Sequence, residues 1–264
     1  MKQIGLNKII SVFIIIAVVM CGSFPAEANN YNREMDTNSL EEPVRITELA
    51  NLREENSETY LLSNGDYECV VYAEDKYYKN EQGEYRLIDN RLIGCSYGDS
   101  IFCNTESKNK TFFSDSPKVI INSPEATISF EAINARNCSA TIGGSKVFYK
   151  VSDICLSGDN FIAYTDAFND TDLIYEVRPD AVKEYIILKS SSVSSTYSFT
   201  YQTNDLIAEK DMFGRIVIKD SGDNVKFILA DLFAVDFAGN YTENLKLDVV
   251  CNTVGEYTVT VSIP

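Results

Sequence analysis

Apolar and polar residues alternate along most of this chain in short segments that turn-forming residues separate. Two such segments, 172–177 and 182–188, flank the tetrapeptide Arg178-Pro179-Asp180-Ala181. Alternation with a period of two is typical of strands with one buried face, and a Pro-Asp step favours a turn between them. We therefore expect a central hairpin over 166–189, entered through the acidic loop 166–172.

Further segments of this kind precede and follow the central hairpin. Asn64-Gly65 between two of them is a strong hairpin signal, and residues 80–83 repeat the arrangement. The other expected strands are 59–62, 67–72, 77–78, 85–88, 100–103, 118–121, 127–133, 139–142, 146–151, 196–201, 206–209, 216–219, 225–229, 245–250 and 257–263. Strands at this spacing, with almost no helical periodicity, predict an all-β fold of antiparallel β-sandwich type.

The first 28 residues carry the features of a secretory signal peptide. Lys2 and Lys8 give a positive amino end, an apolar run covers 9–20, and Ala26-Glu27-Ala28 supplies a small-x-small cleavage pattern. A membrane anchor is the alternative, but spanning a bilayer takes roughly 20 apolar residues. Cys21 raises lipid attachment, although Met20 stands where a small residue is expected. We predict cleavage, export and no membrane span afterwards.

The rest of the chain divides by composition into two parts. Residues 29–58 are polar and charged and are expected to form a linker or arm. Residues 59–264 are expected to form the β-sandwich module, either as one body or as two packed β units. The serine-rich stretch 190–195 is the expected boundary if there are two units, and the tip of a long hairpin if there is one.

Composition and charge exclude several classes of function. The formal net charge is -16, which disfavours nucleic acid and anionic lipid as partners and suits an extracellular body or one that holds divalent cations. The chain has no histidine, which excludes histidine-based triads and histidine-ligated zinc. Glu176 and Glu184 could face each other as a glycosidase pair, but solvated acidic faces are the favoured interpretation. We expect a non-catalytic protein.

Seven cysteines leave six once the predicted leader is removed. An even number in an exported protein permits disulfides, and the pairing does not follow from sequence. Buried thiols that pack as small apolar residues are the alternative. Cys95 and Cys103 flank the turn-like stretch 96–99, so they are the first pair to expect.

The acidic loop of the central hairpin is the best candidate for a metal site. Asp166, Asn169, Asp170 and Asp172 offer the oxygen ligands that calcium prefers, in a flexible loop. Their spacing is not that of an EF-hand. The alternative is that these side chains cap turns through hydrogen bonds to the backbone.

Tyrosines around one predicted hairpin are candidates for carbohydrate binding. Tyr77, Tyr78 and Tyr85 lie on either side of the turn 80–83, where alternate residues share one face of the hairpin. Exposed aromatic rings can stack on sugar faces, whereas tyrosines in sheets also cover the core. The three residues therefore form a predicted platform with that alternative open.

Two stretches resemble a known bacterial module. They are 60–92, with Asn64-Gly65 and the run Ile88-Asp89-Asn90-Arg91-Leu92, and 171–177 followed by Val182-Lys183-Glu184. Together they are similar to the N-terminal β module of secreted, wall-associated proteins of Gram-positive bacteria, the YD-repeat (RHS-like) and DNRLRE-domain proteins.

This resemblance covers about 59–264 and implies a non-catalytic, all-β segment with cell-wall or surface components as partners. It carries no catalytic residues. Two features depart from the family pattern. Tyr85 stands where relatives often have tryptophan, and no YD-repeat array precedes Pro264. We accordingly expect a truncated or stand-alone member.

Overall fold

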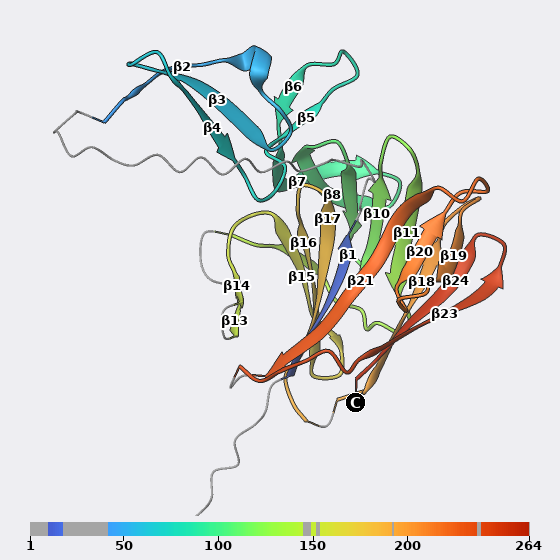
Figure 1. The fold of residues 1–264 in the computed structure, drawn as a ribbon. Coiled ribbons are helices and arrows are strands. Elements are labelled where there is room, and N and C mark those ends of the chain that lie inside the picture. The colour runs from blue at the N-terminus through green and yellow to red at the C-terminus, as the bar shows by residue number, and fades with distance from the viewer. Residues whose placement is uncertain are drawn as a thin grey trace, which may run out of the picture. The chain divides into compact units, whose positions relative to one another are not determined.

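The computed structural model describes residues 10–17, 42–144, 149–151, 154–191, 193–236 and 239–263. It is built almost entirely of antiparallel strands (Figure 1), which confirms the predicted all-β class. The chain divides into two compact units: Met1–Met20 with Ile88–Pro264, and Cys21–Leu87. This division falls inside the segment 59–264 that we expected to be one module.

The smaller unit contains a three-stranded sheet and a separate hairpin. The sheet has the order β2 (Arg45–Glu48), β3 (Ser57–Leu62), β4 (Tyr67–Val71), and the hairpin joins β5 (Tyr77–Lys79) to β6 (Tyr85–Leu87). Both hairpins predicted here are confirmed. Gly65 turns the chain with a φ of 89°, and Asn64 Oδ1 accepts a hydrogen bond from the Asp66 amide at 3.0 Å.

Part of the predicted arm belongs to this unit. Strand β2 pairs with β3, and a short 3-10 turn, Ala50–Leu52, links the two strands. The side chains of β2 are mostly exposed, so its polar sequence reflects an edge strand rather than a linker. Residues 29–41 of the predicted arm lie outside the described residues.

The larger unit is a sandwich of two sheets. The first has nine strands in the order β12 (Ala140–Ile142), β15 (Phe161–Phe168), β16 (Thr171–Val177), β17 (Ala181–Leu188), β1 (Ile10–Ala17), β21 (Val225–Asp236), β20 (Ile216–Lys219) and β19 (Ile207–Lys210), with β22 (Tyr241–Thr242) paired to β21. The second has eight strands in the order β23 (Lys246–Thr253), β24 (Glu256–Ser262), β18 (Thr196–Gln202), β11 (Thr127–Ala132), β10 (Lys118–Asn122), β9 (Lys110–Ser114), β8 (Ser100–Glu106) and β7 (Asp89–Tyr97). A small hairpin joins β13 (Tyr149–Val151) to β14 (Ile154–Leu156).

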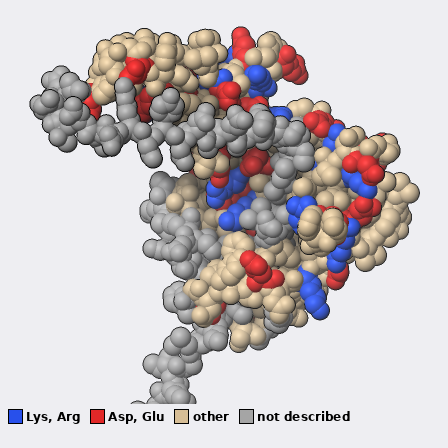
Figure 2. All heavy atoms as spheres, in the orientation of Figure 1, with Lys and Arg blue, Asp and Glu red and all other residues tan. Residues whose placement is uncertain are grey.

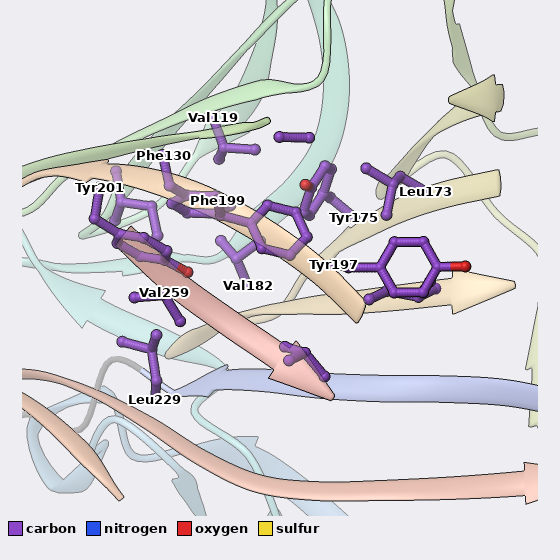
Figure 3. Packing of buried hydrophobic residues seen from close by; sticks show 14 of the residues in the cluster. Val119, Phe130, Leu173, Tyr175, Val182, Tyr197, Phe199, Tyr201, Leu229 and Val259 are labelled. Carbon is purple, nitrogen blue, oxygen red and sulfur yellow. The ribbon is translucent and has the colours of Figure 1, made fainter. Parts of the chain in front are cut away.

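Side chains from both sheets interlock to form the core between them. Aromatic residues carry much of it (Figure 3), and the rings of Phe130 and Tyr201 stack with centroids 5.0 Å apart. The serine-rich stretch leads from β17 in the first sheet to β18 in the second. It is therefore a connection between the layers of one sandwich rather than a boundary between two units.

The central hairpin is buried on both faces, which differs from the half-buried strands that we expected. Leu173 and Tyr175 face the core between the sheets. Ile174, Tyr185 and Ile187 belong to a second apolar cluster on the opposite face of the first sheet. The alternation in this segment therefore does not separate a buried face from a solvated one.

A strand from the predicted leader lies inside the first sheet. Strand β1 pairs antiparallel with β17, from Ser11↔Ile187 to Ala17↔Ala181, and antiparallel with β21 on its other side. The rest of the leader, including Cys21 and the cleavage pattern, lies outside the described residues. Cleavage of the leader therefore stays a prediction.

Candidate functional site

An aromatic groove of ≈ 590 Å³ opens on the larger unit. It lies between the β19–β20 turn, strand β21 with β22, and the segment that leads into β23. Its lining consists of Phe213, Gly214, Arg215, Leu229, Leu232, Phe233, Tyr241, Glu243, Leu245 and Leu247. Its volume is within the range of small-molecule and cofactor binding sites, roughly 300–1,000 Å³.

The β19–β20 turn forms one wall of the aromatic groove. Asp211 Oδ1 accepts hydrogen bonds from the backbone amides of Phe213 and Arg215, each at 2.9 Å, and Gly214 has a φ of 82°. A short acidic side chain that bonds ahead to its own backbone fixes such a turn. The turn holds Phe213 75% exposed.

The opposite wall comes from the β21–β22 connection. Asp236 Oδ1 accepts a hydrogen bond from the Asn240 amide at 2.9 Å, and strand β22 then returns beside β21 with Tyr241 opposite Val235. The rings of Tyr241 and Phe233 lie 5.2 Å apart. Tyr241 is 58% exposed, so two large rings, Tyr241 and Phe213, stand in solvent around one depression.

Aliphatic side chains form the floor of the aromatic groove. Leu229 and Leu247 are buried, and Leu232 and Leu245 are half-buried. A ligand that covers this apolar floor and its aromatic rim removes apolar surface from water. This is favourable by roughly 25 cal/mol per Å² of apolar surface removed. Such a surface is typical of a binding site.

The polar groups at the rim are tied into intramolecular pairs. Arg215 Nη2 lies 2.7 Å from Asp211 Oδ2, and its guanidinium lies 5.3 Å from the centre of the Phe213 ring. The pKa of Asp211 is lowered: burial opposes this, but hydrogen bonds from Arg215 and from two backbone amides outweigh burial. The Tyr241 hydroxyl donates to Glu243 Oε1 at 2.7 Å. The carboxylate of Glu243 is the acidic group in this lining.

The structure brings two of the four predicted calcium ligands together, but around a lysine. Lys189 Nζ lies 2.8 Å from Asp166 Oδ1 and 2.6 Å from Asp172 Oδ1. Arg136 donates to Asn169 Oδ1 at 2.9 Å, and Ser190 donates to Asp170 Oδ2 at 3.3 Å. Hydrogen bonding to Lys189 lowers the pKa of Asp166. Across the described residues, no group of three or more acidic, cysteine or histidine side chains is placed to hold a metal ion. Lys189 and Arg136 supply positive charge to this loop, and calcium binding stays a prediction.

The predicted tyrosine platform does not form one surface. Tyr77 pairs with Leu87 and Lys79 with Tyr85 across the β5–β6 hairpin, so Tyr78 lies on the face opposite to Tyr77 and Tyr85. Tyr77 is only 7% exposed, and its hydroxyl donates to Glu58. The platform expectation is wrong because one of its rings belongs to the interior of the smaller unit.

Glu58 is the centre of that interior, and sequence reasoning missed it. This carboxylate, 3% exposed, accepts hydrogen bonds from the hydroxyls of Tyr60 at 2.8 Å, of Tyr72 at 2.5 Å and of Tyr77, and from Lys76 Nζ at 2.7 Å. Lys76 and the tyrosines hold the pKa of Glu58 well below its usual range. The cluster is fully paired, which indicates a structural role.

The structure places Cys95 and Cys103 next to each other. Strands β7 and β8 pair with Ile93 opposite Cys103, and the two sulfur groups interact. Both are free thiols here, and Cys103 is buried. Burial, followed by the neighbouring Cys103 thiol, raises the pKa of Cys95 to about 12. The pair expected from the sequence is thus in contact, and its oxidation stays a prediction.

Glu176 and Glu184 do not face each other. Glu176 lies opposite Lys183 and accepts a hydrogen bond from the Tyr185 hydroxyl at 2.5 Å, whereas Glu184 lies opposite Tyr175. Neighbouring register positions on an antiparallel pair point to opposite faces of the sheet. The two carboxylates therefore cannot act on one substrate, and the structure gives no support to a glycosidase pair here.

Figure 2 shows acidic and basic side chains interspersed on the described part of the face that it draws. Among the residues that the structure describes, no helix is both long and apolar enough to cross a bilayer.

The aromatic groove was not predicted from the sequence, although a weak signal was present. Phe213 stands between Asp211 and Gly214, and Tyr241 directly follows Gly239-Asn240, so each aromatic residue lies at a turn signal. Only the fold brings the two turns to the same place. No family model, no curated protein and no solved structure matches this chain, so the geometry of the described residues is what bears on its function.

Proposed function

We propose that this chain is an exported, non-catalytic interaction module of the bacterial cell surface that binds wall components through the aromatic groove. The observation that carries the proposal is the pair of exposed rings, Phe213 and Tyr241, above an aliphatic floor. The signal-peptide pattern and the family resemblance support the location.

Wall glycan is the ligand class that the groove fits best. Aromatic rings cover the apolar faces of sugars, and the free N–H groups of Arg215 and the second oxygen of Glu243 can bond to hydroxyl or acetamido groups. A wall-bound strand also tolerates a shallow, open site, because many weak contacts along a polymer add through multivalency.

The experiment is calorimetric titration of the protein with soluble fragments of Gram-positive peptidoglycan and with wall polysaccharide. The double variant Phe213→Ala and Tyr241→Ala is expected to lose binding by at least tenfold, since each ring covers much of the ligand. Met212→Ala is the matched control, because Met212 is 90% exposed in the same turn and does not line the groove. Equal binding by the double variant and the control would refute the groove as the site.

Export is tested separately by cell fractionation. The proposal expects the mature form outside the membrane, without the first 28 residues. Full-length protein retained in the cytoplasm would contradict this part of the proposal while leaving the titration result unchanged.

A further inference from the structure

Strand β1 fills a place in the first sheet that we call the strand slot: the space between β17 and β21. It pairs with seven residues of β17, from Ala181 to Ile187, and with residues of β21 between Ile228 and Asp236. Both pairings are antiparallel, so β17 and β21 run parallel to each other. If β1 were lost, the sheet could close only if β17 and β21 paired with each other. That pair would be parallel in an otherwise antiparallel sheet, and one half of the sheet would have to move by about 4.8 Å, the spacing between strands.

Apolar side chains line the strand slot on both faces of the sheet. On β17, Ile186 faces the sandwich core and Ile187 faces the second cluster. On β21, Leu229 and Val235 take the same two roles. An empty slot would expose these side chains together with two rows of unpaired backbone groups, which is a template for another strand.

One carboxylate oxygen in the wall lacks a hydrogen-bond partner. Glu184 is 1% exposed, faces the core from the middle of β17, and its Oε1 has no hydrogen-bond partner. Burial raises the pKa of Glu184 to about 8, and the nearby Tyr175 hydroxyl opposes the rise. The residue of β1 at the opposite register position is Ile14, a residue type without a hydrogen-bond donor. An unpaired buried polar group is unfavourable, so the leader sequence complements the slot incompletely.

We infer that the strand slot is an acceptor site for an extended segment of a partner polypeptide, which replaces the leader after export. The segment runs antiparallel to β17 and β21, is apolar at most of its eight positions, and carries a hydroxyl residue opposite Glu184. This is recognition by strand addition, in which backbone pairing supplies affinity and alternate side chains supply specificity. The inference rests on the export step of the proposed function and is independent of the aromatic groove.

The test uses the full chain with a specific protease site placed within residues 21–28. After cutting, the protein is incubated with excess synthetic peptide: the sequence 10–17, the same peptide with Ile14→Thr, or the same peptide with Ile14→Pro, each with lysines added at the ends. Hydrogen exchange of the β17 and β21 amides reports whether the slot is filled, and fluorescence anisotropy reports affinity.

The Ile14→Thr peptide is expected to replace the leader, to protect the β17 and β21 amides, and to bind about tenfold more tightly than the unchanged peptide, the usual effect of one hydrogen bond to a buried group. In protein carrying Glu184→Met, the two peptides are expected to bind equally. Because the two peptides are compared on the same protein, any loss of overall stability caused by Glu184→Met affects both affinities equally. Ile14→Pro should bind weakly, since proline removes a ladder hydrogen bond.

Three outcomes would overturn the inference. The β17 and β21 amides could stay protected once the leader is removed and no peptide is present, which would show that the sheet closes on itself. The Ile14→Pro peptide could bind as well as the others, or the peptide-free protein could dimerise through these strands, which would make a second copy the occupant. None of these readouts needs export, so they test strand addition separately from export. An uncleaved leader in cells would refute the export step of the proposed function, and with it the replacement of the leader in cells.

Discussion

The ammonium group of Lys189 lies 2.6 Å from the carboxylate of Asp172 and bridges it to Asp166 across the β15–β16 connection. Asp172 is buried in β16, and Lys189 follows directly after β17. The ion pair therefore links the two strands of the central hairpin at their open end. Lys189 thus compensates part of the negative charge of the acidic loop.

Replacing this lysine is expected to destabilise the sandwich without creating a strong metal site. Lys189→Met should lower the free energy of unfolding by about 1–2 kcal/mol, because Asp172 would stay buried without a counter-charge. This value lies between those of exposed and of buried ion pairs. Lys189→Arg should recover most of the loss. Thermal unfolding with and without calcium checks both points. A large calcium-dependent stabilisation of the unchanged protein would show that the lysine is displaced by the ion.

Glu58 predicts an acid-sensitive smaller unit. Its pKa is depressed in the folded state, so its contribution to stability is fully present above the unfolded pKa of about 4.3 and is lost as pH falls below it. Glu58→Gln should cost about 2–3 kcal/mol at pH 7, because Lys76 loses its counter-charge in a buried cluster, and should flatten the acid dependence. Hydrogen exchange of the β3 and β4 amides between about pH 2 and 6, which spans the range below the unfolded pKa, measures this.

The matched control for Glu58 is Glu68→Gln in the neighbouring strand. Glu68 pairs with Arg45 at 2.7 Å, but both side chains are substantially exposed. Solvent screens such a pair, so Glu68→Gln should change the free energy of unfolding by no more than about 1 kcal/mol. Equal effects at both positions would mean that the tyrosine cluster contributes little beyond a surface ion pair.

Local sequence patterns predicted the hairpins because their signals are local. Asn64-Gly65 and the Pro-Asp step each fix a turn within four residues, and the strands on either side pair in the register that the turn imposes. The contact between Cys95 and Cys103 was predictable for the same reason, since one tight turn separates their strands.

Relationships between distant segments were not predictable in this way. Tyr77 appears as a candidate sugar-binding ring in the sequence, but its hydroxyl meets Glu58, nineteen positions earlier. The aromatic groove depends on two turns that the sheet order alone brings together. Burial of the central hairpin on both faces likewise depends on what covers the first sheet, which a period of two cannot report.

The raised pKa of Glu184 predicts a pH dependence of stability that is opposite in sign to that expected from Glu58. Its folded pKa of about 8 lies above the unfolded value, so the folded state keeps a proton that the unfolded chain releases. Stability should therefore fall as pH rises from about 4.5 to 8, by up to roughly 1.4 kcal/mol per pH unit, and level off above that. Glu184→Gln should remove the slope. Urea unfolding of the larger unit followed by tyrosine fluorescence across this range checks it, and an unchanged slope in the variant would assign the dependence to other groups.

The last prediction concerns the Cys95 and Cys103 thiols. In an exported protein they are expected to form a disulfide that links β7 to β8, with each thiol losing its hydrogen to a thiol–disulfide oxidant. Trypsin places both residues in the single peptide 92–108, so oxidation lowers the mass of that peptide by two hydrogen atoms. The raised pKa of Cys95 keeps its thiolate scarce, so formation in vitro should be slow at neutral pH and faster in alkaline solution.

The bond should add about 2–3 kcal/mol to the free energy of unfolding, the value for a short closed loop. Urea unfolding with and without reductant measures the gain, and Cys103→Ser should abolish it. Cys251→Ser is the control, since Cys251 is exposed in a different strand. Complete alkylation of both thiols in exported protein would contradict the prediction. It would leave Cys95 and Cys103 as packed thiols between two strands whose pairing already holds them together.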